Sequence, residues 1–103
     1  MSKMIDVAER QILRKEILSI LAETDEQGAT PKLLKVVLMK QGYEVNDLVI
    51  SLELKYLAGK ELVKSEVVAN KALGIKREIV HITSKGIDVL EGTIEVEGIE
   101  VGE

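Results

Sequence analysis

The spacing of the apolar residues changes from a helical to a strand-like period after Gly59. Before this glycine, apolar residues recur at steps of three and four, which is the period of an amphipathic helix. After it, residues 62–68 and 78–83 are rich in β-branched side chains and partly alternate between apolar and polar, as strands do. This order of helices followed by a hairpin excludes an all-helical bundle, and it excludes a ferredoxin-like fold, which needs strands before the first helix.

The first helix is predicted over residues 5–21. Its start has two interpretations: Asp6 with Glu9 forms a capping box, or Ser2 caps the helix one turn earlier. The apolar stripe that indicates this helix consists of Ile5, Ala8, Ile12, Leu13, Ile17, Ile20 and Leu21.

Two shorter helices follow, each with its own start signal. Thr30 supplies a capping hydroxyl before Pro31, whose missing N–H costs nothing at the first helical position. Gly42 is expected to end that helix in a left-handed cap, and Asn46 offers the N-cap of the next helix, over residues 47–58. Two short helices joined by a tight turn are typical of a helix-turn-helix pair.

The hairpin strands are predicted to be joined by a long tip over residues 69–77. Thr83 or Ser84 then caps a short helix that runs through Leu90. The predicted fold class is therefore mainly α with a small β-hairpin, a winged helix-turn-helix, in one domain of residues 1–92. Residues 93–103 are predicted to form an acidic C-terminal strand or arm, because apolar residues there alternate with glutamates.

Composition excludes most catalytic and metal chemistry. The chain of 103 residues has no Cys and a single His, His81, so disulfides, thiolate metal sites, Cys nucleophiles and multi-His zinc sites are excluded. Its eight glycines are scattered, so no phosphate-binding loop is expected. We expect no enzyme activity, catalytic residue, metal, cofactor or small-molecule ligand. Charges interrupt every apolar run, so we expect no membrane contact and a cytoplasmic location.

Four short segments of the sequence together resemble one family. The segments are Gly-x-x-Val-Asn at 42–46, Glu-Leu-x-Tyr-Leu-x-x-x-x-Leu-Val at 53–63, Ile-Thr-x-x-Gly-x-Asp-Val-x-x-Gly at 82–92 and Gly-Ile at 98–99. From about Ile12 to Ile99 the chain resembles small winged-helix proteins of Mu-like phages and prophages, which are compared with ArsR-type regulators. The resemblance implies a nucleic-acid-binding fold encoded in a phage gene cluster. The sequence departs from the family at Glu61, where a glycine commonly ends the third helix, and Gly59 is expected to take that role.

A winged helix places its third helix in the major groove of DNA and rests its hairpin, the wing, against the backbone or the minor groove. Polar side chains of that helix are suited to base edges, and cations of the wing are suited to phosphates. Lys32 and Lys35 of the second helix would lie near the backbone in this pose. The predicted DNA contacts are Asn46, Ser51, Lys55, Lys64, Lys71, Lys76 and Arg77.

The predicted function is a phage- or prophage-type transcriptional regulator that binds double-stranded DNA as a homodimer. A dimer is expected because the third helix carries more large apolar residues than one core-facing stripe buries. Its interface is predicted to use the first helix, the tail or both, with a patch of Leu48, Val49 and Leu52 as a second surface. The alternative is a protein-interaction module, such as a phage assembly or packaging accessory without DNA binding. The net charge of −4 and that apolar patch favour this alternative.

Overall fold

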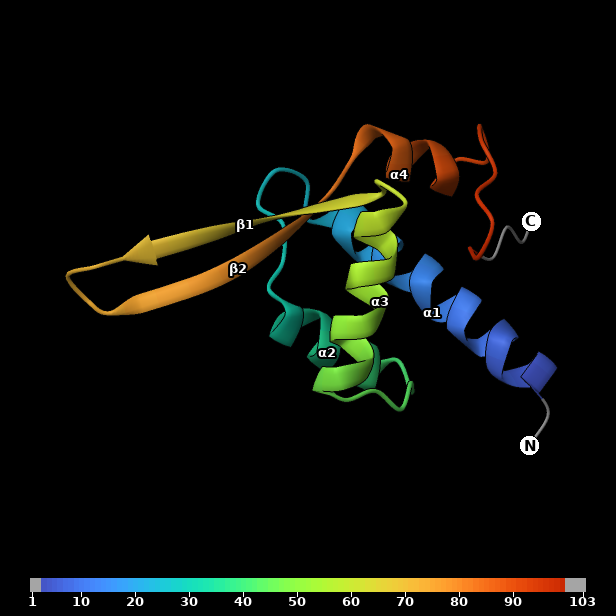
Figure 1. Cartoon of the computed structure of the whole chain (residues 1–103), viewed down its shortest axis with the longest axis horizontal. Coiled ribbons are helices and arrows are strands. Elements are labelled where there is room, and N and C mark those ends of the chain that lie inside the picture. The colour runs from blue at the N-terminus through green and yellow to red at the C-terminus, as the bar shows by residue number, and fades with distance from the viewer. Residues whose placement is uncertain (1–2, 100–103) are drawn as a thin grey trace.

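Four helices and one hairpin follow each other in the order that the sequence predicts. The computed structural model describes the backbone of residues 3–99 and the side chains of residues 6–99. Its elements are α1 (Lys3–Glu23), α2 (Pro31–Lys40), α3 (Asp47–Gly59), β1 (Val63–Asn70), β2 (Ile75–Ile82) and α4 (Ser84–Leu90). The hairpin lies between α3 and α4 and projects from the helices as a long arm (Figure 1), which confirms the winged helix-turn-helix fold class.

The core lies where the second half of α1 meets α2, α3 and the base of the hairpin. The largest fully buried side chains are Ile17, Leu18, Leu21, Leu34, Leu38, Ile50, Leu57, Leu62 and Val80. Residues 6–10 of α1, in contrast, are all exposed. The first half of α1 therefore extends beyond the core, as Figure 1 shows.

Side-chain caps start three of the helices, as predicted. The Thr30 hydroxyl accepts from the N–H of Leu33 at 3.1 Å, and the Asn46 carbonyl Oδ1 accepts from the N–H of Val49 at 2.9 Å. Thr83 is the cap of α4. For α1 the capping box is wrong, because the helix already includes Lys3 and Asp6 lies inside it. Ser2 lies outside the described residues.

The end of α3 corrects the prediction for Gly59, which remains inside the helix. Glu61 instead takes the left-handed position, with φ of 65°. The N–H of Leu62 donates to the carbonyl of Leu57, and the N–H of Glu61 donates to that of Ala58, both at 2.9 Å. This is the Schellman pattern that usually employs glycine, so a glutamate here accepts the strain of a left-handed backbone.

The two strands are longer and the tip shorter than predicted. Antiparallel pairing runs without interruption from Val63 opposite Ile82 to Asn70 opposite Ile75, so only residues 71–74 form the tip. The turn closes early because Asn70 accepts the N–H of Leu73 through Oδ1 at 3.2 Å. At the base, Ala29 exchanges two backbone hydrogen bonds with Val80, of 2.9 and 2.8 Å, and so fixes the arm to the loop before α2.

The C-terminal segment packs against the helices. Residues 93–99 form turns and bends and contain no strand, so the predicted strand is absent from this stretch. The carbonyl of Glu97 accepts from the Tyr56 hydroxyl at 3.1 Å, and Ile99 is buried. A side chain at Gly98 would collide with the Tyr56 hydroxyl. Residues 100–103 of the predicted arm lie outside the described residues, and a domain boundary at residue 92 stays a prediction.

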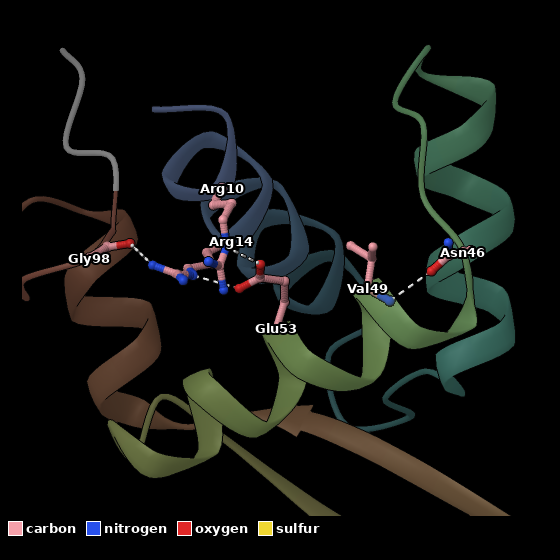
Figure 2. A network of polar contacts seen from close by, with 6 residues as sticks. All are labelled: Arg10, Arg14, Asn46, Val49, Glu53 and Gly98. Atoms are coloured by element: carbon pink, nitrogen blue, oxygen red, sulfur yellow. Dashed lines mark hydrogen bonds and ion pairs between the residues drawn. The ribbon is translucent and has the colours of Figure 1, made fainter. Parts of the chain in front are cut away.

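A buried ion pair joins α1, α3 and this C-terminal segment (Figure 2). Glu53 is 2% exposed and accepts from Arg14 Nε at 2.6 Å and from Arg10 Nε at 3.1 Å. The other end of the Arg14 guanidinium donates from Nη1 to the carbonyl of Gly98 at 2.9 Å, and its centre lies 3.7 Å from the centroid of the Tyr56 ring. Both charged groups are thus fully engaged in the interior.

We predict that Glu53→Ala lowers the free energy of unfolding by about 3–5 kcal/mol, because Arg14 is left buried without its counter-charge. Equilibrium urea unfolding followed by circular dichroism measures the loss. Glu44→Ala, at an exposed glutamate, is the matched control and should change stability by less than about 0.5 kcal/mol. A loss below about 1 kcal/mol for Glu53→Ala would show that the pair contributes little.

Candidate nucleic-acid interface

The outer face of α3 and one face of the wing line the same groove. Side chains alternate between the two faces of a hairpin, and the register places Ser65, Lys76 and Glu78 on one face. Ser65 and Glu78 line a concavity of about 380 Å³ together with Ser51 and Lys55 of α3. We call this concavity the helix–wing groove. It lies between α3 and the wing, the two elements through which a winged helix contacts DNA.

The predicted contacts lie in four places. Ser51 and Lys55 line the helix–wing groove, and Lys76 lies farther out on the same face of the wing. Lys64 and Arg77 lie on the opposite face of the hairpin. Lys71 lies in the turn at the tip. Asn46 lies at the start of α3, where its Oδ1 is occupied by the helix cap. The seven residues therefore do not form one patch, and which of them contact DNA stays a prediction.

Two residues of the wing that line the groove, Ser65 and Glu78, were not among the predicted contacts. The carboxylate of Glu78 adds a negative charge to a wall that would face phosphates. The alternation of side chains along the strands would place Ser65 and Glu78 on the face toward α3, but only once the tip is known to be residues 71–74. The predicted nine-residue tip does not fix the register of the two strands, so the face of each strand residue cannot be assigned from it.

A second carboxylate that lines the groove, that of Asp47, forms an ion pair. Lys35 Nζ of α2 lies 2.7 Å from Oδ1 of Asp47, at the start of α3. The hydrogen bond and the positive charge of Lys35 lower the pKa of the Asp47 carboxyl below its usual value, and Lys32 adds a smaller effect. The ion pair with Lys35 would therefore reduce the repulsion between the Asp47 carboxylate and the phosphates of a bound duplex.

The opposite face of the wing carries a separate polar pair. Nε2 of His81 lies 2.8 Å from Oε2 of Glu66, and the two residues are neighbours on the face that also holds Lys64. Between residues 6 and 99, the structure brings together no group of three His, Cys, Asp or Glu side chains able to hold a metal ion. No helix in the described range is long and apolar enough to cross a bilayer.

The three residues of the predicted apolar patch on α3 differ in exposure. Leu48 and Leu52 are 66% and 50% exposed, whereas Val49 is half-buried and packs against the core. Leu52 lines a concavity of about 710 Å³ between α1 and α3, whose lining also includes one cation, Arg10, and the carboxylates of Asp6, Glu9, Glu44 and Glu53. Burial and the charge of nearby Glu16 raise the pKa of Tyr43, which lines this second concavity. This side of α3 is therefore apolar and acidic, unlike the helix–wing groove.

Comparisons with known proteins find similar folds among solved structures. No family model matches the chain, and no curated protein matches it by sequence. Among solved structures, a PadR family transcription regulator from Clostridium difficile has a TM-score of 0.67 at 22% identity, over 79% of this chain and 81% of that one. A proposed transcriptional regulator from Thermoplasma acidophilum has a TM-score of 0.66 at 22% identity, over 92% of this chain and 84% of that one. Neither comparison supports the resemblance to ArsR-like proteins of Mu-like phages, which stays a prediction.

We predict that Lys35→Met raises the pKa of the Asp47 carboxyl toward its usual value, and that Lys32→Met raises it less. Side-chain NMR titration of Asp47 measures both. A carboxyl pKa that is lower in the folded chain means that the ion pair stabilises the fold above the unfolded pKa, and that this stabilisation is lost as pH falls through the folded value. An unchanged Asp47 titration in Lys35→Met would show that the contact is absent in solution.

Proposed function

We propose that this protein is a transcriptional regulator that binds double-stranded DNA through α3 and the wing. The observation that carries this proposal is the helix–wing groove, in which Ser51 and Lys55 of the helix and Ser65 of the wing line one concavity. A duplex docked there would receive the helix in its major groove and the wing against its backbone. The similarity of the fold to that of two solved structures described as transcription regulators supports the same function.

Each predicted contact takes a role in this proposal that follows from its position. Ser51 and Lys55 read base edges from the middle of α3. Asn46 positions the first turn of α3 through its cap, which directs the helix into the groove. The cations of the wing bind phosphates and carry no sequence information. These wing residues are Lys64, Lys71, Lys76 and Arg77.

We further propose that the regulator acts as a homodimer through the first half of α1. Residues 6–10 are exposed around the helix, and Val7 is 52% exposed, so this half-helix lacks the packing that normally stabilises a helix in water. The alternative interface on the tail is disfavoured, because Ile99 is buried and Ile94 and Val96 pack against the core of their own chain. The phage or prophage setting rests on the sequence resemblance alone.

One observation favours a second candidate function, a protein-interaction module without DNA binding. Leu48 and Leu52 are 66% and 50% exposed, and Leu52 lines the second concavity together with Asp6, Glu9 and Glu44. An exposed apolar surface of this kind suits a protein partner. The net charge of −4 of the chain disfavours binding to DNA. The two functions differ in their response to salt, because only DNA binding releases condensed counterions.

We predict that changing Lys71, Lys76 and Arg77 together to Ala weakens DNA binding across all sequences. It should also reduce the slope of log affinity against log salt concentration by about 2.7, since each phosphate contact contributes about 0.9. Mobility-shift titrations with random duplex from low to high salt measure the slope.

The control changes Lys40, Lys60 and Lys85 to Ala and removes the same charge from the ends of α2 and α3 and from α4. This control should leave the slope within about one unit of the parent value. Equal slopes for the two triple variants would remove the wing from the DNA interface.

Sedimentation equilibrium at micromolar concentration is predicted to return twice the mass of one chain. Val7→Asp should shift the protein toward the monomer, because it places a charge in an apolar contact between copies. Leu33→Asp, at a similarly exposed residue of α2, is the control and should leave the dimer intact. A monomer at all concentrations would contradict the dimer.

A further inference from the structure

The tip of the wing ends in an exposed leucine on an ordered turn. Leu73 is 68% exposed, the highest value among the exposed large apolar residues of the described chain. Its N–H donates both to the backbone carbonyl and to Oδ1 of Asn70, each at 3.2 Å. Gly74 follows with φ of 65°, which lets the chain reverse without strain. The leucine is therefore held at the apex of the arm by its own turn.

The cations around this leucine lie on both faces of the arm. Lys76 lies on the face that carries Ser65 and Glu78 toward α3, whereas Arg77 lies on the opposite face. Lys71 lies in the turn itself. Residues 67–77 contain these three cations and no acidic side chain. Positive charge on both sides of an apolar tip matches a groove with phosphates along both walls better than a single phosphate strand.

The arm is long enough to place this tip in a groove of its own. β2 begins at Ile75, directly after the turn, and its buried residue is Val80, five positions farther from the tip. Five residues of strand span roughly 17 Å, which is about half of one turn of the DNA helix. With α3 in the major groove, the tip therefore reaches the neighbouring minor groove.

We propose that Leu73 is a wedge that enters the minor groove, separates two stacked base pairs and kinks the DNA that this protein binds. The inference rests on the proposed DNA binding and adds a distortion that a wing lying along phosphates would not produce. Apolar wedges flanked by Lys and Arg unstack base steps in this way and bend the duplex by roughly 20–90°. Because flexible steps such as TA are the easiest to open, the leucine would make the protein prefer such steps without hydrogen bonds to bases.

Ring closure of short DNA tests the wedge without knowledge of an operator. Fragments of about 100 bp are shorter than the persistence length of about 150 bp, so DNA ligase closes them slowly unless a protein bends them. The full-length protein should accelerate closure of a random-sequence fragment by about tenfold or more. Mobility-shift titrations on the same fragment give, for each variant, the protein concentration at which an equal fraction of the DNA is bound.

Three variants separate the wedge from ordinary binding. At equal occupancy, Leu73→Ala should lose most of the acceleration, and Leu73→Met should retain it because a long apolar side chain remains. Both should keep the parent salt dependence, since no charge changes. Val68→Ala removes an exposed apolar side chain from the flank of the same arm and should close rings as the parent does.

The outcomes distinguish the inference from the proposed function. If the parent protein does not retard DNA even at low salt, DNA binding itself is wrong and the wedge with it. If the parent binds without accelerating closure, or Leu73→Ala accelerates it equally, the wedge is overturned while DNA binding stands. A Leu73→Ala variant that closes rings normally but loses self-association without DNA would assign the leucine to a contact between copies.

Discussion

The buried ion pair of Arg14 and Glu53 holds one face of α3 toward α1, so that the other face points toward the helix–wing groove. Moving two charges out of water is costly, so such a pair persists only where both partners are fully engaged, and here α1, Tyr56 and the carbonyl of Gly98 engage them. Because Glu53 must point inward, Ser51 and Lys55, two positions to either side, point away from α1. Together with the buried Ile50 and Leu57 of the same helix, this contact fixes the rotation of α3 about its axis and hence the face that α3 offers to the helix–wing groove.

Much of the fold could be predicted because its signals are local. The hydroxyl of Thr30 and the amide of Asn46 act within three residues of their own helix starts, so the sequence order alone indicates them. The change of apolar period after Gly59 likewise needs only neighbouring residues. The order of elements, and with it the fold class, follows from such signals.

The remaining features depend on contacts between distant parts of the chain. Arg14 and Glu53 are 39 positions apart, and each looks like a surface residue when its helix is considered alone. Glu61 takes a left-handed position that its residue type disfavours, because the turn after α3 is set by the packing of Leu62. The site was only partly predictable for the same reason, since the faces of Lys76 and Glu78 depend on where the hairpin turns.

The pairing of the arm also restricts how its length can evolve. The base is fixed in register by the bridge between Ala29 and Val80, so any change in length must occur beyond it. Inserting one residue in each strand would move every side chain nearer the tip to the other face and exchange the sides of Lys76 and Arg77. Inserting two in each would restore the faces and lengthen the arm by roughly 7 Å. Related arms should therefore differ in length by even steps, which makes strand parity a criterion for recognising proteins that share this surface.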